Sequence, residues 1–354
     1  MNLESIPKIN TTQLAQILGF KEVEILNRES ILEHKEKIIE RIDWKRPSSN
    51  HIQTMFIKYG KGLYFARELF FYDALSTPVK DQIPELITCQ TNPDLLVLVI
   101  EWIDGYNPDF KDKAVVKQTF KNLGIWAAHW EKPIQNYMNG DKNALTIKNS
   151  HYGEWSTDDL LNGLNAKDKI YWIFTDTAAS VKNNQDIVMD LGGKHLVKFF
   201  QKLNSDLRQY LIDKIYSVPL TLHPGDVSKY NTLVRKSSKQ IYFVDFEGIK
   251  ICPMSVLMEF IGESWESVPQ GSLATVALES YFNAWNKYSS TTPITWNTFI
   301  DSYISTRILH KCYLIKWWIS KNGSVNPENR TPEKEWVKQH ALDLLDLIKK
   351  LEKQ

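Results

Sequence analysis

The hydrophobic pattern of the chain changes near residue 104, and this change constrains the fold more than any other feature. Before it, residues 38–44, 52–59 and 95–102 are short stretches rich in Ile, Val, Leu and aromatic residues, which is typical of β-strands. After it, apolar residues recur at the spacing of amphipathic helices. These helical stretches include residues 116–130, 196–211 and 299–319.

The break itself, residues 104–108, reads Asp-Gly-Tyr-Asn-Pro and suits a linker. We therefore expect an α+β protein, with a strand-rich part over residues 1–103 and a larger, mainly helical part over residues 104–354. A polar Pro/Ser turn over residues 45–50 joins the first two strands, which predicts an antiparallel hairpin.

Charge and cysteine content exclude several classes of protein. The 43 Lys and Arg residues balance the 42 Asp and Glu residues, whereas proteins that bind nucleic acids or anionic membranes usually carry a marked positive excess. Three cysteines are too few for a disulfide framework, and the longest apolar run, residues 95–100, is too short to cross a bilayer. The first residues lack the apolar core of a secretory signal. We expect a cytoplasmic protein with neither a nucleic-acid nor a membrane partner; no pattern predicts its oligomeric state.

Residues 220–248 carry three polar side chains at a spacing that suits phosphoryl transfer. Four residues separate Asp226 from Asn231, and Asp245 ends the predicted strand over residues 241–245. Transfer from a nucleoside triphosphate needs one carboxylate beside the attacking hydroxyl, and an amide oxygen and a second carboxylate that hold Mg²⁺. Kinases carry these groups as Asp-x-x-x-x-Asn and as an aspartate at the end of the following strand. Asp226 alone is equally typical of a turn cap, so the prediction depends on the joint spacing.

This segment resembles the Brenner-type motif of the aminoglycoside phosphotransferase and choline kinase-like families. Those families typically show His-Gly-Asp-x-x-x-x-Asn and then a strand ending in Ile-Asp-Phe-Glu or Ile-Asp-Trp-Glu. Here the first part reads His223-Pro224-Gly225-Asp226, one residue longer, and the second contains Asp245-Phe246-Glu247. The resemblance implies a protein-kinase-like fold with two lobes, a small N-lobe built on an antiparallel sheet and a larger, mainly helical C-lobe.

The resemblance continues upstream in the expected order. Lys58 ends the strand over residues 52–59, where these families place a phosphate-binding lysine. Glu68 lies within a stretch that matches their pattern Arg-Glu-x-x-Phe-Tyr-x-x-Leu, whose glutamate fixes that lysine. The stretch Leu-Val-Ile-Glu-Trp-Ile-Asp-Gly is similar to their hinge strand, which implies that the backbone at Glu101 and Ile103 contacts adenine.

The resemblance implies ATP and Mg²⁺ as cofactors and a role for each matching side chain. Asp226 is expected to orient and deprotonate the acceptor hydroxyl, while Asn231 and Asp245 hold Mg²⁺. Lys58, fixed by Glu68, is expected to neutralise phosphate charge. Taken alone, Lys58 is more typical of a solvated lysine at a strand end, and Glu68 is also compatible with an ordinary surface pair with Arg67 or Lys61.

Two features depart from the family pattern. These families usually open the N-lobe with a glycine-containing loop over the phosphates, but residues 20–50 contain no glycine. We expect residues 27–30, Asn-Arg-Glu-Ser, to replace that loop with backbone N–H groups. An Asp-Leu-Ala sequence usually follows the metal-binding strand, whereas residues 253–257 contain no aspartate.

The expected function is an ATP-dependent kinase that transfers the γ-phosphoryl group to a hydroxyl of a small molecule, an antibiotic or a metabolite. An aminoglycoside substrate calls for acidic residues, for which Glu259, Glu263, Glu266 and Asp301 are candidates, and a choline-like cation calls for an aromatic cage. The two departures leave open a second interpretation, a pseudokinase or structural protein that keeps the fold without turnover.

Overall fold

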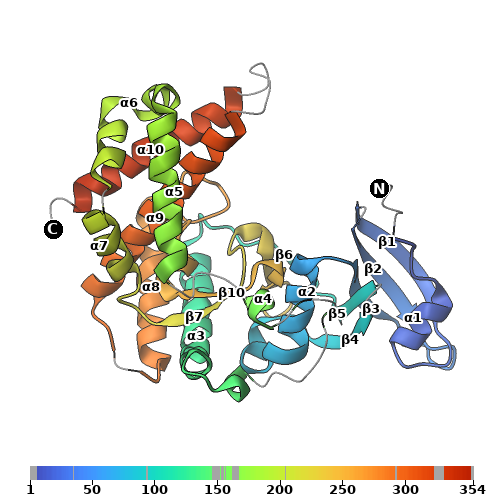
Figure 1. Cartoon of the computed structure of the whole chain (residues 1–354). Helices are drawn as coiled ribbons and strands as arrows, with labels where there is room; N and C mark the ends of the chain where they lie inside the picture. Colours follow the sequence, from blue (N-terminus) through green and yellow to red (C-terminus); the bar gives the residue numbers. More distant parts are fainter. Residues whose placement is uncertain are drawn as a thin grey trace. The chain divides into compact units, whose positions relative to one another are not determined.

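The structure, a computed structural model, describes residues 6–34, 36–92, 95–145, 152, 155, 157–161, 167–203, 205–291, 293–322 and 331–351 (Figure 1). The chain forms two compact units, each assembled from separate segments. The first comprises Met1–Asn162, Leu222–Ile251 and Gly262–Thr291, and the second comprises Gly163–Thr221, Cys252–Ile261 and Thr292–Gln354. The predicted boundary between residues 103 and 104 lies inside the first unit, so the division into 1–103 and 104–354 remains a prediction.

The first unit begins with an antiparallel sheet of five strands in the order β1-β2-β3-β5-β4 (Figure 1). The predicted hairpin is confirmed, because β2 and β3 pair antiparallel from Lys37 opposite Gly60 to Trp44 opposite Gln53. Strand β5, which lies between β3 and β4, is buried along most of its length, as its apolar run predicts. The strands are β1 (Glu24–His34), β2 (Lys37–Lys45), β3 (Gln53–Gly60), β4 (Leu86–Asn92) and β5 (Leu95–Glu101).

The edge strand β1 was not predicted. None of its side chains is buried, so the alternation that identifies a half-buried strand is absent from its sequence. Residues 27–30 lie within β1 and pair with β2. The expectation that these residues form a loop over phosphates was therefore wrong, and the connection between the two strands comes after His34 instead.

A hydrophobic core lies between the sheet and helix α1 (Thr11–Ile17). Ile38, Ile42 and Trp44 alternate along β2 toward this core, where Leu14 of α1 is also buried. Asn10 caps α1 with a side-chain hydrogen bond to the Gln13 N–H. This packing fixes β2 and β3, the two strands that carry the lysines of the candidate site.

The rest of the first unit connects the sheet to helices and short strands. Helix α2 continues as a π-helical turn, Phe71–Leu75, and a 3₁₀ turn, Thr77–Gln82. Strands β6, β8 and β9 form a second sheet in the order β6-β8-β9, and β7 pairs with β10. The elements are α2 (Leu63–Phe70), β6 (Gly105–Tyr106), α3 (Lys113–Met138), α4 (Thr157–Leu161), β8 (Thr232–Arg235), β9 (Ile241–Phe243) and α8 (Ser272–Tyr288). Strands β7 (Leu220–His223) and β10 (Lys250–Pro253) each have residues in both units.

The second unit is mainly helical, and the expected helical C-terminal part is confirmed. The helical pattern over residues 196–211 is interrupted, because the backbone leaves the helical region at Leu203, with φ −72° and ψ 54°. In the part of the chain that the structure describes, no helix is both long and apolar enough to span a membrane. The helices are α5 (Lys167–Asn183), α6 (Gln185–Lys202), α7 (Ser205–Ile215), α9 (Trp296–Asn322) and α10 (Thr331–Leu351).

Candidate active site

Lys58 and Glu68 form a buried ion pair within the first unit. Lys58 lies on β3 and Glu68 on α2, which follows β3 directly, and the Lys58 Nζ contacts the Glu68 Oε2. Burial alone would lower the pKa of Lys58, but the carboxylates of Glu68, Asp245 and Glu247 outweigh it, so the pKa of Lys58 is raised. The ammonium therefore keeps its charge at neutral pH, as contact with a phosphate requires.

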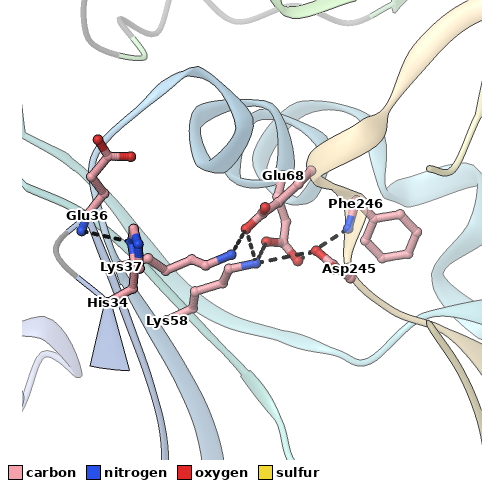
Figure 2. Close-up of polar contacts among 8 residues, drawn as sticks. His34, Glu36, Lys37, Lys58, Glu68, Asp245 and Phe246 are labelled. Atoms are coloured by element: carbon pink, nitrogen blue, oxygen red, sulfur yellow. Dashed lines mark hydrogen bonds and ion pairs between the residues drawn. The ribbon is translucent and has the colours of Figure 1, made fainter. Parts of the chain in front are cut away.

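Asp245 brings a second carboxylate to this lysine. It follows β9 in the left-handed backbone conformation, with φ 64° and ψ 76°, which aspartate tolerates better than most residues. The Asp245 Oδ1 lies 3.5 Å from the Lys58 Nζ, and 44% of the Asp245 side chain is exposed. Asp245 thus belongs to the Lys58 cluster and remains accessible to a ligand (Figure 2).

Glu68 also holds the turn that presents Asp245. The Phe246 N–H donates to the Glu68 Oε1 at 3.3 Å, so one carboxylate binds both Lys58 and this turn. The buried Phe246 ring packs against Phe71 with centroids 4.3 Å apart and stacks on Trp126 of α3. These contacts position Asp245 relative to β3 and α2.

Glu247 and Lys37 complete the charge cluster; the motif includes Glu247 without a role for it, and no sequence pattern indicated Lys37. The Glu247 Oε1 lies 2.5 Å from the Lys58 Nζ and 2.7 Å from the Lys37 Nζ. Burial alone would raise the pKa of Glu247, but the two ammonium groups outweigh it and hold that pKa below its usual value. Lys37 and Glu247 are 210 positions apart in the sequence, so no local pattern indicates their contact.

Asp226 and Asn231 lie together on the loop between β7 and β8. The Asn231 Nδ2 is 3.4 Å from the Asp226 Oδ2, and the Ser228 Oγ donates to the same oxygen at 2.9 Å. Asp226 is exposed, so its carboxylate can reach an external hydroxyl. The Val244 N–H donates to the Asn231 carbonyl at 3.0 Å, which places the loop beside the turn that carries Asp245.

Two glycines bring this loop and the turn into backbone contact. A Cβ on Gly248 would lie 3.0 Å from the Gly225 Cα, and one on Gly225 would lie 3.2 Å from the Asp245 carbonyl oxygen. Gly225 also has a φ of +121°, which L side chains rarely adopt. The buried His223 accepts the Gly225 N–H at its Nδ1, 3.0 Å away, and so supports the residue before Asp226.

The donor set at Asn231 and Asp245 suits a hard divalent cation. Mg²⁺ prefers oxygen ligands and commonly takes one or two carboxylates together with substrate phosphates. Because the Asn231 amide nitrogen is directed at Asp226, its amide oxygen is available as a ligand. The carboxylate oxygens of Glu68, Asp245 and Glu247 also lie within 4.8 Å of one another. The residues present therefore fit the expected metal.

Glu101 and Ile103 lie where β5 ends. The Glu101 carboxylate pairs with Arg235 of β8, and the Glu101 N–H donates to the Glu85 carbonyl at 2.8 Å. The Ile103 side chain is buried, and no hydrogen bond among the described residues uses its N–H. This N–H remains available to an adenine ring, whereas the Glu101 N–H is already used in the sheet.

Two of the acidic residues considered for a cationic substrate are paired with lysines. Glu266 pairs with Lys229 at 2.9 Å, and Asp301 pairs with Lys214 at 2.6 Å. Glu263 and Glu266 belong to the first unit, while Glu259 and Asp301 belong to the second.

The fold is that of known small-molecule kinases. A choline kinase from Cryptosporidium parvum Iowa II matches 94% of this chain and 90% of its own, with a TM-score of 0.51 and 15% sequence identity. An aminoglycoside phosphotransferase from Alicyclobacillus acidocaldarius subsp. acidocaldarius DSM 446 matches 99% and 98%, with a TM-score of 0.51 and 13% identity. No protein-family model and no curated protein matches the chain. The resemblance expected from the motifs is thus confirmed at the level of the fold.

Proposed function

We propose that this protein is an ATP- and Mg²⁺-dependent O-phosphotransferase that phosphorylates a hydroxyl of a small molecule in the cytoplasm. One observation carries the proposal. Within a single unit, the buried Lys58–Glu68 pair lies beside the accessible Asp245, and the glycine contact brings the loop of Asp226 and Asn231 to the same turn. These are the groups that phosphoryl transfer from a nucleoside triphosphate requires.

The proposed nucleotide site uses both backbone and charge. The N–H of Ile103 and the backbone at Glu101 contact the adenine, while Lys58 neutralises charge on the phosphates. Asn231 and Asp245 hold Mg²⁺, which supplies charge neutralisation at the phosphate oxygens when bound. Glu68 acts through Lys58, because its carboxylate holds the ammonium in place and also fixes the Asp245 turn.

Asp226 is the proposed general base. Its Oδ2 is held by Ser228 and Asn231, so the carboxylate has a defined orientation and can accept the proton of the acceptor hydroxyl. The transition state of phosphoryl transfer is loose, so positioning and charge stabilisation contribute most of the rate. A single base of this kind contributes roughly 10²- to 10⁴-fold.

The proposed acceptor is a small alcohol, an antibiotic such as an aminoglycoside or a metabolite such as a choline-like compound. Two observations favour the second candidate function, a pseudokinase with weakened turnover: residues 20–50 contain no glycine, and residues 253–257 contain no aspartate. The two candidates differ in a simple way, since only the kinase forms ADP in proportion to an added alcohol.

The test is acceptor-dependent ADP formation, screened with aminoglycosides, choline, ethanolamine and sugars, for the wild type and Asp226→Asn. We expect transfer to fall by at least about 10²-fold in Asp226→Asn, while Mg²⁺-ATP binding stays within about twofold because Asp226 is not among the residues proposed to hold Mg²⁺ or the nucleotide. The matched control is Asp213→Asn, which removes an exposed carboxylate of α7 paired with Lys167 and is expected to leave transfer unchanged. Equal transfer in wild type and Asp226→Asn contradicts the proposed mechanism.

A further inference from the structure

In the turn between β1 and β2, the backbone of Glu36 contacts the end of strand β3. The Lys61 N–H donates to the Glu36 carbonyl at 2.9 Å, and a Cβ on Gly60 would lie only 2.3 Å from that oxygen. The glycine that permits close approach here is thus on β3 and not in the turn itself. Lys37, the first residue of β2, is held directly beside this contact because it pairs with Gly60.

The strand register places Lys37 and Lys58 on the same face of the sheet. Lys58 pairs with Ile39 and Lys37 pairs with Gly60, so the two lysines are diagonal neighbours across β2 and β3. Both ammonium groups meet at the Glu247 Oε1. The Lys58 side chain is buried, whereas 24% of the Lys37 side chain is exposed. Lys37 is therefore more accessible than Lys58 to a ligand from solution.

The charges of the cluster point to the ligand. Two like-charged ammonium groups side by side repel each other and stay together only because carboxylates surround them. Lys58 has three carboxylate partners, while Lys37 has only Glu247 among the ion pairs of the described residues. A chain of phosphates beside Lys58 offers Lys37 the same favourable contact at several oxygens.

We propose that Lys37 is a second cationic contact for the phosphate chain of the nucleotide, at the turn where the resembling kinases carry a glycine loop. In this proposal Glu247 holds the Lys37 ammonium in position before the nucleotide binds. This inference rests on the proposed function. It explains how a turn without glycine can bind phosphates, since a side-chain ammonium takes the place of close backbone approach. Glu247 then acts as a positioning residue that orients both ammonium groups toward one side.

The experiment measures dissociation constants of AMP, ADP and ATP in Mg²⁺ by calorimetry for the wild type, Lys37→Gln and Lys37→Arg. We expect Lys37→Gln to weaken ATP binding about 5- to 20-fold and to leave AMP binding unchanged, because the lost contact is to the β- and γ-phosphates. Lys37→Arg is expected to restore ATP binding to within about threefold of the wild type. Lys37→Met, which keeps the aliphatic stem, replaces the Gln variant if that variant does not fold.

The matched control is Lys45→Gln at the other end of β2, where the lysine is 27% exposed and has a single partner, Glu24. It is expected to bind ATP as the wild type does. If the wild type binds ATP and Lys37→Gln binds it equally well, the role of Lys37 is wrong and the proposed function stands. Equal weakening for AMP and ATP also overturns it, because the variant then disturbs the site as a whole. A wild type that binds no nucleotide overturns both proposals.

Discussion

The charge cluster around Lys58 places five ionisable side chains close together, two cationic and three acidic. Each cation has a specific partner, so the cluster is a set of oriented pairs and not a general accumulation of charge. Glu68 connects two parts of the site, because it binds Lys58 and also accepts a hydrogen bond from the Phe246 N–H of the turn. Removing a buried carboxylate of this kind lowers stability, because its buried cationic partner loses that counter-charge.

Glu68→Gln tests this structural role, because it removes the charge and leaves the size of the side chain nearly unchanged. Lys58 keeps Asp245 and Glu247 as partners, so we expect the free energy of unfolding to fall by about 1–3 kcal/mol. Glu24→Gln breaks the exposed pair with Lys45 and is expected to change it by less than about 0.5 kcal/mol. Urea unfolding followed by tryptophan fluorescence measures both. Equal shifts for the two variants would show that the buried pair contributes no more than a surface pair.

At the scale of elements, the site depends on two segments that approach with no side chain between them. Gly225 precedes Asp226 and Gly248 closes the turn of Asp245, and their backbones are in contact. Sequence spacing predicted both segments, because each motif is local. It did not indicate the role of Gly248, since that role exists only after β7, β8 and β9 have brought the segments together.

Gly248→Ala is expected to separate these segments. The added Cβ would meet a backbone atom, the Gly225 Cα, which cannot move aside as a flexible side chain would. We expect a loss of about 1–3 kcal/mol in stability and a fall in transfer of at least about tenfold, because small misplacements between reacting groups are costly. Gly140→Ala, at φ +100° with open space around the new Cβ, is the control. It is expected to lose about 1 kcal/mol and to keep its transfer rate; similar transfer rates in the two variants would contradict the positioning role.

The burial of side chains within each strand explains which strands could be predicted from the sequence. β2, β3 and β5 have buried positions that leave a hydrophobic pattern, and all three were predicted. β1 is an edge strand with no buried side chain, so its sequence carries no such pattern. The sequence therefore predicts a loop, and not a strand, at residues 27–30. Lys37 was missed for another reason, because its partner Glu247 is 210 positions away in the sequence and no local pattern indicates their contact.

At the scale of the whole molecule, all the candidate site residues belong to one unit formed from distant segments of the chain. Motif spacing predicted the pieces around Lys58, Glu68, Asp226, Asn231 and Asp245, and the structure brings these pieces together. The grouping of the segments into units could not be predicted from periodicity, since the contacts that define them join residues far apart in sequence. The division at residues 103 and 104 remains a prediction.

Calorimetry of Mg²⁺-ATP binding to the wild type and Asp245→Asn tests the claim that this unit binds a metal-nucleotide complex. Asparagine also tolerates the left-handed conformation at this position, so the variant removes charge while keeping the turn. We predict Mg²⁺-dependent binding by the wild type, abolished by chelation of the metal, and binding at least about tenfold weaker in Asp245→Asn. Absence of binding in both proteins, or equal binding in both, would contradict the claim.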